Sequence, residues 1–187
     1  MNWKAFMVCA LITMSPLVCS ALDGIEVLSG YFKADLNQND EDYEGIPLLV
    51  GFNFDGRPLL EKAGIETAGR FDLIIEPFFN TMTSPGHTDI EVGSNFLFKY
   101  VFPLTESIQP YVKGGVGALY MSEHTREQST QYNFLPQGGA GFHVFMDEKT
   151  ALSFEWRFRH LSNASIESPN SGIDGNMFLG GISFYFE

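Results

Sequence analysis

One segment of the chain, 150–163, alternates apolar and charged side chains so regularly that few folds can accommodate it. Successive side chains of a β-strand point to opposite faces of the sheet. One face of this segment carries Leu152, Phe154, Trp156 and Phe158, and the other carries Ser153, Glu155, Arg157 and Arg159. A soluble protein would need a second layer to cover the aromatic face, whereas in a membrane barrel lipid covers it and the charges pair inside. The pattern therefore favours a membrane-spanning strand.

Seven further segments show the same period of two, with Gly, Pro, Asn and Asp at the breaks. The eight predicted strands are 24–33, 45–55, 70–80, 89–101, 107–121, 132–145, 150–163 and 173–186. Most exceed the roughly five or six residues usual in soluble sheets and match the roughly 9 to 11 of a tilted membrane strand. The predicted fold is all-β, an eight-stranded antiparallel transmembrane β-barrel of the bacterial outer membrane.

The first 21 residues have the layout of a secretory signal peptide. A basic start at Lys4 precedes an apolar run over 5–18 and a small-residue site at 19–21. We therefore predict a signal peptide over 1–21 and a single barrel domain over 22–187, because a chain of 187 residues is short for two domains.

Composition removes several other classes of protein. Both cysteines, Cys9 and Cys19, fall in the predicted signal peptide, so disulfides cannot stabilise the exported domain. A lipid anchor on Cys19 would need small residues before it, and Leu17 and Val18 fit that poorly. The formal net charge of −12 argues against a nucleic-acid partner. No later stretch approaches the roughly 18 apolar residues of a membrane helix, so a closed barrel remains the way to cross lipid.

An even number of strands places both ends of the barrel domain on the periplasmic side. The outer connections are then predicted at 34–44, 81–88, 122–131 and 164–172. The inner connections include a short turn at 146–149 and a longer one at 56–69, where we expect a little extra structure.

The outer end of the seventh strand carries a candidate nucleophile and base. By alternation, His160 and Ser162 share the outward, lipid-facing side of Trp156 and Phe158. Two residues along a strand separate their Cα atoms by about 6.6 Å, within reach of a side-chain contact after modest twist. A histidine beside a serine is the minimum for an activated serine nucleophile.

A third group must hold the imidazole in the right tautomer. Asp174 begins the neighbouring eighth strand and is the first candidate, and Glu167 in the intervening loop competes with it. Asn163 and Asn170 offer amide donors near the site, as an oxyanion would require.

The same residues also have a plain interpretation. His-x-Ser is common by chance, and a polar pair can simply mark the membrane interface. Here, however, titratable groups end an aromatic lipid-facing row, where burial is costly and function is the default explanation.

Two short motifs then indicate a family. They are His160-Leu161-Ser162-Asn163-Ala164 and Pro169-Asn170-Ser171-Gly172-Ile173-Asp174. Together they resemble the signature of the PagL family of lipid A 3-O-deacylases, outer-membrane enzymes akin to acyloxyacyl hydrolases. The resemblance implies Ser162 as nucleophile, His160 as base, and Asp174 where the family has a glutamate.

The resemblance also implies the remaining features of the site. Asn170 would contribute to the oxyanion hole, while Asn163 and Ala164 would shape the site. The implied reaction is hydrolysis of the 3-O-linked acyl ester of lipid A, with lipopolysaccharide as partner among the outer-membrane lipids, at a site facing the outer leaflet. A serine mechanism needs no metal or organic cofactor. A homodimer is compatible with this interpretation.

Three other functions stay open from the sequence. The chain could be a non-catalytic structural or adhesion barrel, or an esterase acting on another outer-membrane lipid. A binding barrel of the lipocalin sort would need an apolar interior, against which the charged inner faces of the strands argue.

Overall fold

The computed structural model describes residues 22–36, 41–84, 87–122 and 128–186. The predicted signal peptide over 1–21 lies outside these residues. Within them, no helix is both long and apolar enough to cross a membrane.

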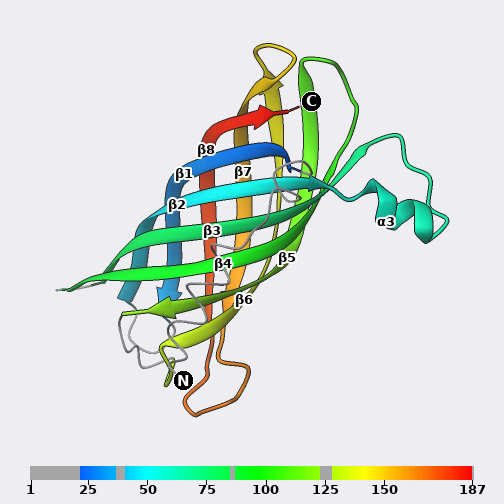
Figure 1. The fold of residues 1–187 in the computed structure, drawn as a ribbon. Coiled ribbons are helices and arrows are strands. Elements are labelled where there is room, and N and C mark those ends of the chain that lie inside the picture. The colour runs from blue at the N-terminus through cyan, green and yellow to red at the C-terminus, as the bar shows by residue number, and fades with distance from the viewer. Residues whose placement is uncertain (1–21, 37–40, 85–86, 123–127, 187) are drawn as a thin grey trace, which may run out of the picture.

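The described chain is dominated by eight strands. They are β1 (Leu22–Leu36), β2 (Glu41–Asp55), β3 (Arg70–Ser84), β4 (His87–Val101), β5 (Ile108–Met121), β6 (Tyr132–Phe145), β7 (Thr150–Leu161) and β8 (Ile173–Tyr185). Each strand pairs antiparallel with the next, and β8 pairs with β1, so the sheet closes into a barrel (Figure 1). Closure leaves no sheet edge unpaired. The predicted fold class is confirmed.

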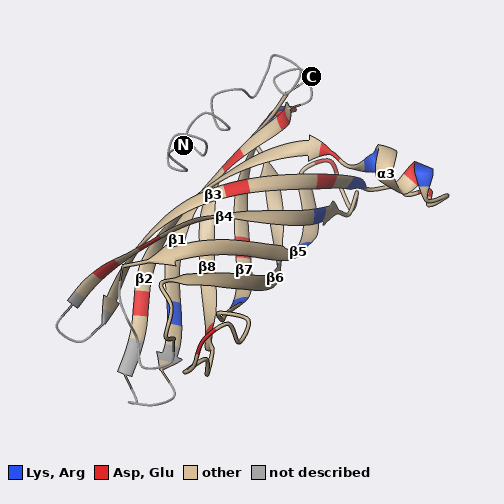
Figure 2. Cartoon of the chain, turned by 60° about the horizontal axis from the view of Figure 1, so that its bottom comes forward, with Lys and Arg blue, Asp and Glu red and all other residues tan. Residues whose placement is uncertain are grey.

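The two ends of the barrel differ. Gly24 of β1 pairs with Tyr185 of β8, so the start of β1 and the end of β8 lie at one end. The β2–β3 connection at the same end contains a short helix, α3 (Arg57–Lys62), which is the extra structure expected within 56–69. It buries none of its residues, projects from the barrel and carries charges of both signs (Figures 1 and 2). The β7–β8 loop lies at the opposite end (Figure 1).

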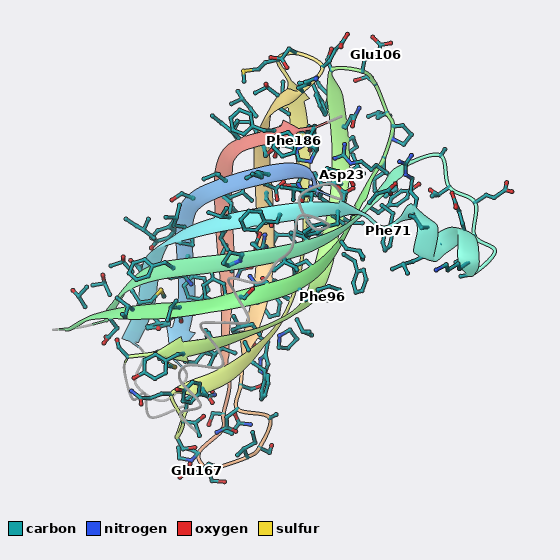
Figure 3. The ribbon with its side chains drawn as sticks, in the orientation of Figure 1. Asp23, Phe71, Phe96, Glu106, Glu167 and Phe186 are labelled. Carbon is teal, nitrogen blue, oxygen red and sulfur yellow. The ribbon has the colours of Figure 1, made fainter. Side chains whose placement is uncertain are left out.

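Large apolar side chains cover the outer face of the barrel. Phe71 and Phe96 point away from the barrel (Figure 3), and Phe96 is 46% exposed. On β7, Phe154 and Trp156 are exposed in the same way, while the alternate residues Glu155 and Arg157 are buried. Because water would not stabilise so wide an apolar surface, this face is the one that lipid covers.

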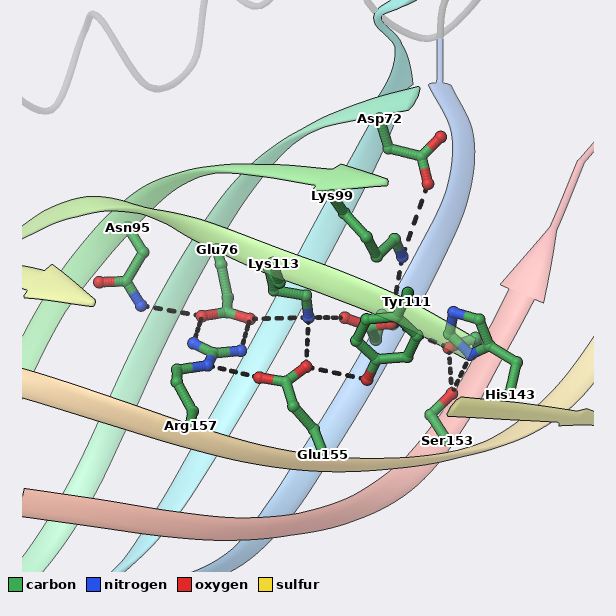
Figure 4. A network of polar contacts seen from close by, with 12 residues as sticks. Asp72, Glu76, Asn95, Lys99, Tyr111, Lys113, His143, Ser153, Glu155 and Arg157 are labelled. Atoms are coloured by element: carbon green, nitrogen blue, oxygen red, sulfur yellow. Dashed lines mark hydrogen bonds and ion pairs between the residues drawn. The ribbon is translucent and has the colours of Figure 1, made fainter. Parts of the chain in front are cut away.

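Charged side chains fill the interior and pair across it. Arg157 donates to both carboxylate oxygens of Glu76, at 2.6 and 3.1 Å, and to Glu155 (Figure 4). Lys113 bridges Glu155 at 2.7 Å and Glu26 at 2.5 Å. The predicted pairing of charges inside the barrel is therefore observed, and these paired groups occupy space that an apolar ligand cavity would need.

Strands β1 to β4 are longer than the sequence indicated at the end that carries the β7–β8 loop, whereas β7 ends at Leu161, two residues earlier than predicted. The predicted connections at 34–44 and 81–88 were too long, since β1 runs to Leu36, β2 starts at Glu41, and β3 and β4 meet at the pair Ser84–His87. Backbone hydrogen bonds continue the ladder whatever the side chains are. Polar side chains therefore mark the boundary between lipid and water, and the strands continue beyond that boundary.

Candidate active site

His160 lies near the end of β7 on the outer face of the barrel. Trp156 and Phe158 precede it on the same face and are 46% and 39% exposed. Its neighbours Arg159 and Leu161 point inward and are buried. Strand alternation thus places the imidazole on the apolar outer wall, as the sequence predicted.

Asp174 is the direct cross-strand partner of His160. The two residues face each other in the β7–β8 ladder, and Nδ1 of His160 lies 2.5 Å from Oδ1 of Asp174. A carboxylate accepts hydrogen bonds, so the Nδ1–H of His160 donates to Asp174. Directly opposed residues have Cβ atoms only about 5 Å apart. This proximity explains why an aspartate reaches the ring without the extra methylene of a glutamate.

Ser162 follows immediately after the end of β7 and is held by the other neighbouring strand. Its N–H donates to the carbonyl of Phe134 in β6 at 3.1 Å, and its own carbonyl accepts the N–H of Phe134 at 2.8 Å. Ser162 is half-buried, two residues from His160. The structure thus joins His160 to Asp174 directly and sets Ser162 beside them, with no hydrogen bond between its hydroxyl and the imidazole among the residues described. Nucleophile–base hydrogen bonds of this kind commonly tighten only when substrate binds.

The two candidate amide donors, Asn163 and Asn170, differ in how far hydrogen bonds to the protein already occupy their side-chain NH₂ groups. Asn163 is fully buried, and its side-chain amide donates to Ser129 Oγ at 3.1 Å and to the carbonyl of Glu167 at 2.9 Å. Asn170 Oδ1 accepts the backbone N–H of Asn163 at 2.8 Å. That contact orients the Asn170 amide, and among the described residues its Nδ2 makes only a long 3.4 Å contact to Ser165 Oγ. Asn163 therefore holds the loop in place, while the Asn170 NH₂ has donor capacity to spare.

The remaining sequence candidates lie in the β7–β8 loop. Glu167 has an exposed side chain, at the end of the barrel opposite Phe186 (Figure 3). The backbone carbonyl of Glu167 accepts a hydrogen bond from the Asn163 amide, and the carboxylate at the imidazole is that of Asp174. Ala164 is exposed and adopts a left-handed φ of 54°, so it helps turn the chain away from β7.

Sequence reasoning missed Gly172. Its backbone lies against the ring of His160, so that a Cβ at this position would sit 2.5 Å from the imidazole Cε1. Gly172 also has a left-handed φ of 79°. A glycine before a strand is an ordinary turn signal, and only the fold reveals that this one lies against His160.

The described residues contain no group of three or more His, Cys, Asp and Glu side chains that could hold a metal ion. What the site does hold is a histidine paired with a carboxylate, a serine beside it and an amide donor nearby. This set can carry out nucleophilic acyl transfer.

Comparisons with known proteins agree with the fold. The crystal structure of the outer membrane enzyme PagL is similar at a TM-score of 0.59 and 19% identity, covering 87% of this chain and 99% of that one. Neisserial surface protein A (NspA) is similar at a TM-score of 0.63 and 10% identity, covering 87% and 96%. At these identities the likeness concerns the fold alone. A search of curated proteins finds no match.

Fold and site together define an outer-membrane β-barrel with a polar cluster at one end of its outer wall. The family model described as "Lipid A 3-O-deacylase (PagL)" matches residues 48–183, which is more than half of the chain and includes the whole cluster. The chain belongs to the lipid A 3-O-deacylase (PagL) family.

Proposed function

We propose that this protein hydrolyses the 3-O-linked acyl ester of lipid A, with Ser162 as nucleophile, His160 as general base and Asp174 as the group that orients it. The observation that carries the proposal is the 2.5 Å contact between His160 Nδ1 and Asp174 Oδ1 on the lipid-facing wall, two residues from Ser162. Family membership supplies the substrate class.

The first half of the reaction forms an acyl-enzyme. Ser162 Oγ attacks the ester carbonyl carbon while its proton passes to Nε2 of His160. Asp174 accepts the Nδ1–H throughout and stabilises the resulting imidazolium. The carbonyl oxygen becomes an oxyanion, for which the Asn170 NH₂ is the nearby side-chain donor. The carbon–oxygen bond to the sugar then breaks, and the sugar oxygen takes the proton from Nε2.

The second half releases the fatty acid. A water molecule gives one proton to Nε2 and attacks the acyl carbon of the ester on Ser162. Collapse of this intermediate breaks the bond to Oγ, which recovers the proton from His160. Every proton is transferred by His160, and the reaction consumes one water.

The placement of the site supports a membrane lipid as substrate. His160 and Asp174 are 38% and 60% exposed at the edge of an apolar outer wall, so an ester at the boundary between sugars and acyl chains could reach them without leaving the membrane. We propose that this end of the barrel faces the outer leaflet. Cleavage of a signal peptide over 1–21 would precede insertion.

Mass spectrometry of lipid A tests the proposal in cells that produce either the intact protein or Ser162→Ala. We expect lipid A to lose one 3-linked acyl chain with the intact protein only. Unchanged lipid A in cells that contain the folded, inserted protein would refute this substrate, and loss of an acyl chain from phospholipid in the same extracts would identify the other class of ester.

A further inference from the structure

Gly172 lies at the end of the β7–β8 loop, immediately before β8, and is buried. A Cβ on this residue would lie 2.5 Å from His160 Cε1, 3.3 Å from Nε2 and 3.4 Å from Nδ1. The first distance is shorter than real contacts allow, and the other two are tight. The imidazole of His160 therefore occupies the space that any side chain at position 172 would need.

The close approach of Gly172 matters because the atom that a Cβ would contact is Cε1 of His160. Cε1 lies between the two ring nitrogens, so a push on it moves both of them. Nδ1 would move relative to Asp174, which now lies 2.5 Å away, and Nε2 would move relative to the Ser162 hydroxyl. Asp174 thus holds one nitrogen of the ring, and Gly172 limits where the rest of the ring can lie.

The chain on both sides of Gly172 is fixed. Ile173 is 1% exposed and pairs with Leu161 in the ladder. Earlier in the loop, the carbonyl of Pro169 accepts the N–H of Ser129 at 3.0 Å, and Asn170 is bonded to the backbone of Asn163 at 2.8 Å. His160, by contrast, has a 38% exposed side chain. A clash would therefore be relieved by moving the imidazole outward, because the loop is held in place.

We propose that Gly172 is a positioning residue for His160, and that the absence of its side chain sets the orientation in which the imidazole bonds Asp174 and can take the proton of Ser162. This inference rests on the proposed function for its catalytic consequence. The claim that Gly172 positions the ring concerns only the His160–Asp174 hydrogen bond, and it does not depend on the proposed function.

The chain offers a matched control. Gly64 has nearly the same left-handed φ, +73° against +79°, but nothing lies within 4 Å of where its Cβ would be. Alanine at either glycine adds the same backbone strain, and alanine at Gly172 alone adds the clash. Asparagine tolerates left-handed φ better than alanine does, so it removes much of the strain and keeps the Cβ. The variants are Gly172→Ala, Gly172→Asn, Gly64→Ala and Gly64→Asn.

Kinetics on purified lipid A, with folding checked by heat-dependent gel mobility, give the first readout. Both Gly172 variants should lose about 10²-fold in kcat with little change in KM, because a misplacement of about 1 Å at a catalytic group costs that much. Both Gly64 variants should match the intact protein. Recovery of kcat in Gly172→Asn would assign the defect to backbone strain and overturn the proposal, as would full activity of a folded Gly172→Ala.

Proton NMR gives a second readout that does not depend on the substrate. The His160 Nδ1–H, held by Asp174, should give a low-field resonance in the intact protein and in both Gly64 variants, and it should be shifted or lost in both Gly172 variants. If the intact protein fails to hydrolyse lipid A while the resonance behaves in this way, the proposed function fails and the positioning role stands. A resonance unchanged in folded Gly172→Ala would refute the positioning role.

Discussion

The two faces of β7 use polar residues in opposite ways. Arg157, on the inner face, is 1% exposed and makes hydrogen bonds to Glu76, Glu155 and Gln137. His160, on the outer face, has a 38% exposed side chain bonded to Asp174. The inner charges are neutralised within the protein and stabilise the barrel. In the part of the chain that the structure describes, no residue bonds Nε2 of His160, which faces a surface where lipid offers no partner, and this is the arrangement expected of a reactive site.

The largest effect should come from replacing His160, the proposed base. His160→Gln keeps a polar side chain of similar size but cannot shuttle a proton, so kcat on lipid A should fall on the order of 10⁶-fold, as in serine hydrolases that lose their histidine. Turnover of purified protein in detergent micelles measures this, with gel mobility as the folding check. Substantial turnover by the folded variant would move the base elsewhere.

A somewhat smaller loss is expected at Asp174, the carboxylate proposed to orient the imidazole. Asp174→Asn should lower kcat on the order of 10³- to 10⁴-fold, because an amide no longer stabilises the imidazolium or selects its tautomer. Glu167→Gln is the matched control and should stay within about twofold, since its side chain is exposed in the loop. The reverse outcome would make Glu167 the third member of the site.

On the inner face the expected effect is on stability. Arg157→Met leaves Glu76 and Glu155 without their guanidinium, which should lower the free energy of unfolding by about 3–5 kcal/mol. Arg57→Met removes an exposed pair with Asp55 on the projecting connection and should change it by about 0–1 kcal/mol. Urea unfolding in micelles measures both. Turnover per folded molecule should be unchanged in each variant. Loss of turnover without loss of stability would mean that interior residues take part in the reaction.

The smallest effect is expected at Trp156, and it tests whether the outer face away from the site contributes only to stability. Trp156 Nε1 donates to Asn176 Oδ1 at 3.1 Å, and Trp156→Phe removes this hydrogen bond while keeping an aromatic ring. The free energy of unfolding should fall by about 1 kcal/mol, with kcat within about twofold. A tenfold fall in kcat would instead extend the site along the wall beneath His160.

Local patterns predicted the outer wall well. Alternation in 150–163 placed Trp156 and His160 on the lipid-facing side, and the same rule gave all eight strands. These properties depend on residues close in sequence. The strand ends at the β7–β8 loop end were less predictable, because the backbone ladder continues past the point where side chains turn polar.

Contacts between distant segments were beyond the sequence. Lys113 meets Glu26 across 87 positions, and the register that decides this pairing is a property of the closed barrel. The same holds for the choice between Asp174 and Glu167, which depends on Asp174 standing opposite His160 in the ladder. The approach of Gly172 to the imidazole depends on the path of the whole loop.

The most direct test of the central claim is the reaction of the folded protein with a fluorescent phosphonate directed at activated serines, with the labelled site located by peptide mass spectrometry. We expect a single label on Ser162, formed much more slowly in Asp174→Asn and undetectable in His160→Gln. Labelling at another serine, or labelling of Ser162 at the same rate in all three proteins, would contradict the claim that the pair on the outer wall activates this residue.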